Sequence, residues 1–317
     1  MAEQIADTEE FIDSPQITLA RERSIFDESF PGAFIRAFGS PYLRMEAAQC
    51  IWTVLDKFFF LQYRTAFLPG RVPVSRVDHP LDEKIPFVPS WITVYLDFIG
   101  FWIRIISFLL RVYGRKALSQ TKIFIQSIKR LYLFAVEVYE KNFSTTNRPF
   151  YISRPKFFTI HLTDPHLMCI PSLHVMIVIR VYTDFARMMH SNGDEKRFAR
   201  RTEELRKGAL AITEAVLYVK QHSVNCVAAA MYAMTCFDRE LFPEEEAVHF
   251  ASSLFQDPDE SAHPAKPKNG ARVKPEDGIV IRSHMISLYR RFLSERDETK
   301  HWGEPLLNFL RNDCLQK

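Results

Sequence analysis

The chain has 317 residues, of which 47% are hydrophobic and 25% are charged, with a formal net charge of +3. This composition fits one main domain with an appendage, and so mild an excess of positive charge does not favour nucleic acid as a partner. Ten glycines against 27 phenylalanines favour a helical protein over a turn-rich sheet protein. We therefore expect an all-α fold.

The pattern along the chain divides it into three regions. Residues 1–44 are polar, and they contain no basic stretch followed by an apolar run, so we expect no cleavable signal peptide. Residues 45–240 form the predicted helical domain, and residues 241–317 a polar extension with a Pro-rich linker and short helices. Six apolar segments mark the helical domain, at roughly 46–68, 87–113, 121–140, 172–189, 208–221 and 223–240.

The cysteines follow no metal-binding or disulfide pattern. They are Cys50, Cys169, Cys226, Cys236 and Cys314, with no Cys-x-x-Cys among them and no histidine pair at ligand spacing. We expect reduced thiols that fill apolar space, and neither a metal ion nor another cofactor.

A helix start with an early histidine is the first candidate for function. Pro171 suits a first helical turn and Ser172 suits an N-cap, so the sequence predicts a helix that begins here. The free N–H groups after Ser172, from Leu173 onward, would attract an anion, and His174 would place a proton donor beside it. An incidental histidine at an ordinary helix start is the alternative.

Two cations precede this helix. Lys141 ends an apolar segment, and Arg148 stands beyond six residues that do not favour a helix, with Pro149 after it. On a loop that folds back, a lysine and an arginine can hold the oxygens of a phosphoryl group. The loop histidines His161 and His166, on either side of Asp164, are further candidates for a headgroup pocket.

A third candidate is His222, which stands between two apolar segments. Histidine can act as a phosphoryl nucleophile and form a phosphohistidine that water or an alcohol then opens. Two histidines on opposite sides of a phosphate would divide the work into nucleophile and general acid.

Together these motifs resemble the PAP2 (type 2 phosphatidic acid phosphatase) superfamily, whose pattern is Lys-x6-Arg-Pro, Pro-Ser-x-His and a block that ends His-x3-Asp. The segment 80–90 is similar to one in the lipid-headgroup phosphotransferase branch, which includes sphingomyelin and inositol phosphorylceramide synthases. The resemblance covers residues 45–236 and implies a six-helix, PAP2-like, membrane-embedded bundle with metal-free catalysis. It implies that Lys141, Arg148, Ser172 and Leu173 bind the phosphoryl group, His222 attacks the phosphorus and His174 protonates the leaving oxygen.

The third motif departs from the family pattern. Ala215 and Val216 stand where the pattern has Ser-Arg, and Cys226 stands where it has the aspartate that orients the nucleophile. A neutral cysteine cannot stabilise an imidazolium as a carboxylate does, and misorientation of a catalytic histidine can cost ~10⁴ in rate. Lys220 is an accessory candidate for part of the missing arginine's role, and the neighbouring Asn225 is a candidate acceptor for the N–H bond.

The apolar segments leave two accounts open. In a membrane account, the basic loops 111–121 and 190–207 face the cytoplasm, and all three motifs meet on the opposite face. In a soluble account, the charges inside the segments, such as Asp97 with Arg104, are paired within a globular bundle. We favour the multi-pass membrane protein, with its active face opposite the cytoplasm, because this topology follows from charges not used to find the motifs.

The sequence thus predicts a metal-free lipid phosphoester phosphatase or headgroup phosphotransferase, with a phosphorylated lipid and a membrane as partners. A catalytically weakened protein that binds phosphorylated headgroups, and a soluble PAP2-like phosphatase, are the alternatives. Substrate, acceptor and oligomeric state stay open.

Overall fold

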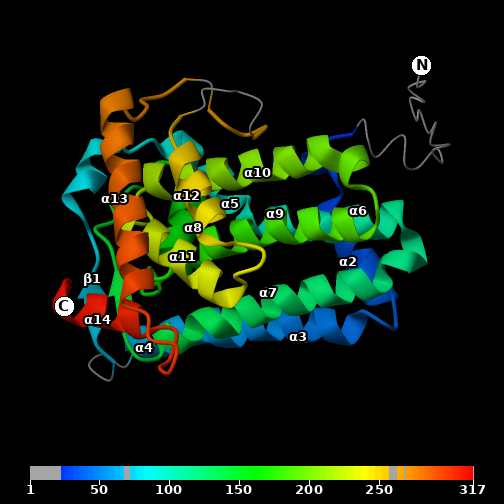
Figure 1. Ribbon diagram of the computed structural model, residues 1–317, viewed down its shortest axis with the longest axis horizontal. Helices are drawn as coiled ribbons and strands as arrows, with labels where there is room; N and C mark the ends of the chain where they lie inside the picture. Colours follow the sequence, from blue (N-terminus) through cyan, green and yellow to red (C-terminus); the bar gives the residue numbers. More distant parts are fainter. Residues whose placement is uncertain (1–22, 68–71, 257–262, 268, 317) are drawn as a thin grey trace, which may run out of the picture.

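The computed structural model describes residues 23–67, 72–256, 263–267 and 269–316, and most of them are helical (Figure 1). The helices of the predicted domain are α3 (Arg44–Val54), α4 (Leu61–Phe67), α5 (Ile92–Leu96), α6 (Phe98–Val112), α7 (Leu118–Tyr139), α8 (Pro155–Thr163), α9 (Leu173–Ser191), α10 (Glu195–Tyr218) and α11 (Val224–Phe237). One more helix, α2 (Phe30–Gly39), lies in the region expected to be a polar N-terminal extension, and it packs against α6 and α3. The C-terminal region adds α12 (Glu244–Ser253), α13 (Pro275–Ser294) and α14 (Glu304–Asn312). A π-helical stretch, Leu55–Phe60, joins α3 to α4.

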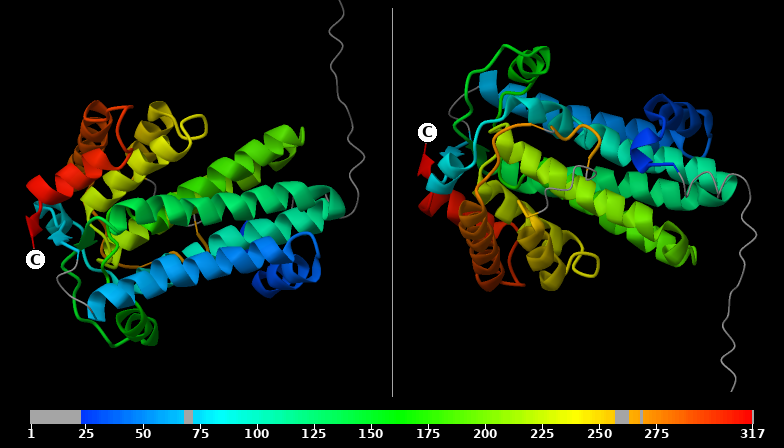
Figure 2. Two further views of the ribbon diagram at one scale, coloured as in Figure 1. Left: turned by 90° about the horizontal axis from the view of Figure 1, so that it is seen from below. Right: turned by 90° about the horizontal axis from the view of Figure 1, so that it is seen from above.

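Helix α9 is the centre of the bundle. It packs against α6, α7, α10 and α11, and every residue from Leu173 to Phe185 is buried. A helix that is buried nearly all round needs other helices to cover it on all sides. The long helices α3, α7, α9 and α10 run along the long axis of the molecule, and α2 lies at one end of it (Figures 1 and 2).

A small sheet lies at the opposite end from α2, near the C-terminus (Figures 1 and 2). Its strands are β1 (Val74–Arg76), β2 (Phe143–Thr145) and β3 (Leu315–Gln316), in the order β2-β1-β3. Strand β1 runs parallel to β2, with Ser75 opposite Ser144, and antiparallel to β3. The stretch after Lys141 is therefore partly a strand and not only a loop.

The C-terminal helices pack on the bundle. In α13, Ile281, Met285 and Phe292 are fully buried, and the helix lies against α11 and α12. The Pro-rich linker expected before α13 is shorter than the sequence suggested, because α13 already begins at Pro275. Residues 257–262 and 268 of this linker lie outside the described part of the chain.

The helical class expected from the sequence is confirmed, and each of the six apolar segments contains helix. The sheet was not expected. Within the described residues, one helical stretch, Pro89–Val112, is long and apolar enough to cross a membrane, with a mean hydropathy of 1.7 and 61% of its most apolar window buried inside the fold. The expected multi-pass insertion is not supported by the other helices.

Charges inside the apolar segments are paired within the protein. Arg104 makes two 2.7 Å hydrogen bonds to Asp97, and Lys129 lies 2.5 Å from Glu46. At the centre of α9, Arg180 donates to Asp184 at 2.7 Å, and both side chains are almost completely buried. Paired charges of this kind are what the soluble account requires.

Candidate functional site

Two predicted catalytic histidines meet at one end of the bundle. His174 lies in the first turn of α9, and His222 lies in the short connection between α10 and α11. Nδ1 of His174 is 3.2 Å from Nε2 of His222, and both side chains are buried. Tyr95 and Phe98 pack on the His174 ring, with ring centroids 4.8 Å and 4.2 Å away.

Arg148 lies beside this pair. Its guanidinium donates to Oε1 of Gln221, the residue before His222, and to the backbone oxygen of Asp164, both at 3.2 Å. The Asp164 carboxylate is 3.8 Å away. The structure thus joins one residue from each of the three sequence motifs, although all three come from different segments of the chain.

Lys141 does not join this group. It follows the end of α7, its side chain is exposed, and it lines neither the chamber around the histidines nor the cleft described below. The Lys-x6-Arg spacing does not bring its two cations together, because β2 runs between them and pairs with β1. Its expected role in phosphoryl binding has no support in the geometry.

The predicted N-cap is in place. Ser172 is the N-cap of α9, and Pro171 precedes the helix instead of lying in its first turn. The backbone N–H of Ser172 donates to the carbonyl of Cys226 at 3.4 Å, while its buried Oγ has no hydrogen-bond partner. Leu173 is the first helical residue and is buried. An unpartnered buried hydroxyl at a helix start is available to a ligand.

The accessory candidates Lys220 and Asn225 make hydrogen bonds within the fold. Lys220 has a positive φ of 55° and donates to two backbone carbonyls, those of Asp82 and, at 2.5 Å, Ile85. The Asn225 amide donates to the carbonyl of Val77 at 3.2 Å, and its oxygen lies 2.8 Å from Nε2 of His284. Neither side chain orients His222.

Cys226 does not take over the missing aspartate's function. Its sulfur accepts the backbone N–H of Ser223 at 3.4 Å, within the capping box of α11. Nδ1 of His222 is buried and has no hydrogen-bond partner. Nδ1 of His222 therefore lacks the acceptor that the resemblance assigns to an aspartate.

The space beside the histidines is small. A chamber of about 10 Å³ is lined by Phe58, Gln62, Tyr95, Asp164, His166, Met168, Cys169, His174 and His222. Such a volume holds about one water molecule. A larger cleft of about 680 Å³ opens nearby, and its lining mixes the basic side chains of Arg76, Arg148 and Lys220 with the carboxylates of Asp78, Asp82, Glu83 and Asp313. Arg148, which also bonds the chamber residue Asp164, stands between the two spaces.

Burial keeps His174 neutral. Desolvation, followed by the neighbouring His222, holds the pKa of His174 well below its usual range. A neutral imidazole is not a proton donor to a leaving group until an anion beside it raises its pKa. A bound phosphoryl dianion would supply that charge.

The sequence interpretation left out most of the chamber. Of the two loop histidines, His166 lines it, whereas His161 on α8 does not. Cys169 was interpreted as apolar filler but lies 3.7 Å from Nε2 of His166. The spacing His166-x2-Cys169 near the Pro-Ser-x-His motif was the one available signal. Among the described residues, no group of three or more His, Cys, Asp or Glu side chains is placed to hold a metal ion.

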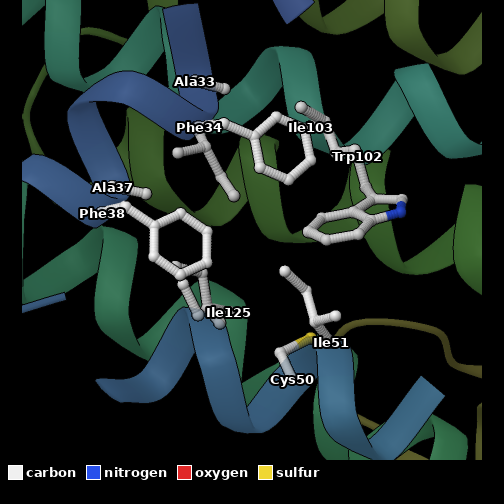
Figure 3. A pocket seen from close by; sticks show the side chains of 11 residues that line it. Ala33, Phe34, Ala37, Phe38, Cys50, Ile51, Trp102, Ile103 and Ile125 are labelled. Atoms are coloured by element: carbon white, nitrogen blue, oxygen red, sulfur yellow. The ribbon is translucent and has the colours of Figure 1, made fainter. Parts of the chain in front are cut away.

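A second hollow lies near the other end of the bundle, between α2, α3, α6 and α7. Its volume is about 30 Å³, and Phe34, Phe38 and Trp102 point into it with Ile51 and Ile103 (Figure 3). Apolar side chains alone line it, so it offers no group for catalysis.

Comparison with known proteins gives no relative. No protein-family model matches the chain, and neither the curated proteins nor the solved structures contain a match.

Proposed function

We propose that this protein is a PAP2-like phosphoester phosphatase or phosphotransferase that works through a phosphohistidine at His222. The observation that carries the proposal is the convergence of Arg148, His174 and His222. They come from three separate segments: the two buried imidazoles lie 3.2 Å apart, and Arg148 donates to Gln221, the residue before His222.

The chemistry follows from the positions of these side chains. A ring nitrogen of His222 attacks the phosphorus, and the ester oxygen leaves with a proton from His174. Arg148 neutralises the phosphoryl oxygens as a planar fork, and the Ser172 hydroxyl, which has no other partner, donates to one of them. Water then opens the phosphohistidine in a phosphatase, and an alcohol opens it in a transferase.

Substrate binding requires the site to open. The 3.2 Å contact between the imidazoles leaves no room for a phosphoryl group, and the chamber holds about one water molecule. The adjoining cleft is the route in, because Arg148 lines it and bonds both Gln221 and Asp164. Phosphoryl oxygens that bind the guanidinium would replace these two acceptors and free the His222 segment to move.

A second candidate is a protein that binds phosphorylated headgroups and turns them over poorly. The unpartnered Nδ1 of His222 favours it, since the sulfur of Cys226 bonds a backbone N–H instead. Both candidates share the Arg148 site, so binding alone does not separate them.

The lipid substrate and the multi-pass membrane insertion stay predictions of the resemblance. The paired charges inside the helices support the soluble form of the proposal, whereas Pro89–Val112 is the segment that would anchor a membrane form. Fractionation without detergent distinguishes the two forms: release into buffer supports the soluble phosphatase, and retention in the membrane pellet supports the lipid enzyme.

The activity test is phosphate release from lipid phosphates, phosphodiesters and soluble phosphomonoesters, compared between wild type and His222→Ala. The matched control is His190→Ala, because His190 is exposed at the far end of α9. Loss of release in His222→Ala alone supports the enzyme. Release that survives His222→Ala overturns the proposed nucleophile, and vanadate binding without any release supports the binder.

A further inference from the structure

The chamber contains a second set of reactive side chains, which the phosphoryl mechanism does not use. The sulfur of Cys169 lies 3.7 Å from Nε2 of His166, and Nδ1 of His166 lies 4.0 Å from the Asp164 carboxylate. All three residues line the chamber. A thiol, an imidazole and a carboxylate in this order are the arrangement that activates a cysteine nucleophile.

The surrounding backbone holds this set in place. Ser144 in β2 accepts the N–H groups of Cys169, at 3.1 Å, and Ile170, at 2.7 Å, through its hydroxyl. His166 has a positive φ of 60°, a backbone conformation that costs energy for a residue with a side chain, and its N–H donates to Asp164 at 2.9 Å. The turn is therefore fixed, and Nε2 of its imidazole lies 2.7 Å from the Thr146 hydroxyl and 3.7 Å from the sulfur of Cys169.

A second thiol completes the cluster. Cys226 lies in the first turn of α11, and its carbonyl accepts the N–H of Ser172, three residues after Cys169. Cys226 is close enough to Cys169 for each thiol to affect the pKa of the other. Both cysteines are free and buried.

The two thiols are electrostatically unequal. Burial alone would raise the pKa of Cys169, but the hydrogen bond with Cys226 and the charge of His166 outweigh it and hold this pKa well below its usual range. Burial and the neighbouring Cys169 raise the pKa of Cys226. Cys169 is thus the sulfur that ionises more easily, which gives the pair the order of an attacking and a resolving cysteine.

The size of the chamber limits what can reach Cys169. A space of about 10 Å³ admits a molecule of roughly the size of water and excludes an acyl group or an ester. Hydrogen peroxide is the oxidant closest to water in size, and it reacts with thiolates rather than thiols.

We propose that Cys169 and Cys226 form a peroxide-reactive thiol pair, in which Cys169 is oxidised first and Cys226 closes a disulfide. The proposal does not depend on phosphoryl chemistry at His222.

The steps balance as a two-electron oxidation. The Cys169 thiolate attacks one oxygen of hydrogen peroxide, the O–O bond breaks, and the leaving hydroxide takes the proton from the His166 imidazolium as water. Cys169 is now a sulfenic acid. The Cys226 sulfur attacks it, the S–S bond forms as the S–O bond breaks, and the hydroxide leaves as water with the Cys226 proton. An external thiol such as dithiothreitol returns both cysteines to the reduced state.

The disulfide would also change the histidine site. The sulfur of Cys226 is the acceptor for the Ser223 N–H in the capping box of α11, next to His222. Bonding it to Cys169 draws it toward the chamber, on the side where His222 lies. Oxidation would therefore alter the surroundings of His222 directly.

The test treats the full-length, reduced protein with hydrogen peroxide and maps disulfides by non-reducing peptide mass spectrometry. Wild type is expected to give a Cys169–Cys226 link that dithiothreitol reverses. Cys226→Ser is expected to leave Cys169 as a sulfenic acid that dimedone traps. His166→Asn, with folding checked by circular dichroism, should slow the oxidation of Cys169, by about tenfold for each unit by which its pKa rises.

Cys50 is the matched control within the same chain. It is as buried as Cys169, at 1% exposure, but burial raises its pKa to about 12. Cys50→Ser should leave the Cys169–Cys226 link unchanged. The proposal is overturned if Cys169 oxidises no faster than Cys50, if the link joins other cysteines, or if Cys226→Ser traps no sulfenic acid at Cys169.

Discussion

Replacement of Cys226 by aspartate tests how far the third motif limits catalysis. The substitution places a carboxylate four residues after His222, at the third residue of α11, where the sulfur now accepts the N–H of Ser223. A carboxylate suits this position, because it can accept the same bond and lies near a helix N-terminus. We therefore expect Cys226→Asp to fold.

The expected gain follows from the unsatisfied Nδ1 of His222. A hydrogen bond to a charged group contributes about 1.5–3 kcal/mol, and each 1.36 kcal/mol in the barrier changes the rate tenfold. A bond made as the imidazole becomes positively charged would thus raise kcat by about ten- to a hundredfold. Ionisation of Cys169, whose pKa its surroundings lower, would oppose the new charge, so the gain should be larger when Cys169→Ser is combined with Cys226→Asp.

The assay is the kcat of phosphate release for wild type, Cys226→Asp and Cys226→Asn. The asparagine has the same shape and accepts a hydrogen bond without a charge, so it controls for packing. An equal gain from Asn and Asp would refute the electrostatic reasoning. No gain from Asp, in either Cys169 background, would refute the view that this position orients His222.

Three further predictions concern the fold. Asp184→Ala should lower the free energy of unfolding in urea by about 3–5 kcal/mol, because it removes one carboxylate partner of the buried Arg180. As a control, Asp297→Ala, which breaks an exposed ion pair with Lys300, should leave this free energy nearly unchanged. Gly208→Ala should lower the free energy of unfolding by about 1–3 kcal/mol, since the added Cβ would lie 2.7 Å from the Phe101 ring. Gly39→Ala is the control, because its Cβ would meet open space, and an equal loss of stability in the two variants would contradict this packing. Burial and the neighbouring His79 lower the pKa of His284 from 6.5 to about 4, so the unfolded chain takes up this proton first and stability should fall as the pH drops from about 6.5 to 4. His284→Gln should reduce that pH dependence in thermal melts, and an unchanged profile would contradict the assignment to His284.

The sequence was sufficient for most of the helices and for the two histidines of the site. Apolar periodicity located the six segments, and the Pro-Ser-x-His motif located the start of α9, because helix periodicity and N-caps are local signals. The residue pair His174 and His222 could be proposed from motif order alone.

The small sheet could not be predicted from local pattern. Strand β2 has three residues, and it forms because β1, distant in the sequence, lies alongside it. The same sheet explains why Lys141 lies apart from the histidine site. The spacing between Lys141 and Arg148 does not reveal that strand β2 lies between these two residues. The side chain of Lys141 is exposed.

The thiol cluster could not be predicted for a related reason. Cys169 and Cys226 stand in separate motifs and follow no spacing rule. Their contact depends on how the turn before α9 meets the first turn of α11, where Ser172 bonds the Cys226 carbonyl. Tertiary packing, and not sequence distance, brings them together.

The central claim is that His222 carries a phosphoryl group during turnover. Rapid quenching of the enzyme with a ³²P-labelled substrate, followed by peptide mapping under alkaline conditions that preserve phosphohistidine, tests it most directly. We predict label on His222, and none in His222→Ala under conditions where His190→Ala is labelled as wild type. Turnover of the substrate with no label on His222, or with label on another residue, would contradict the account.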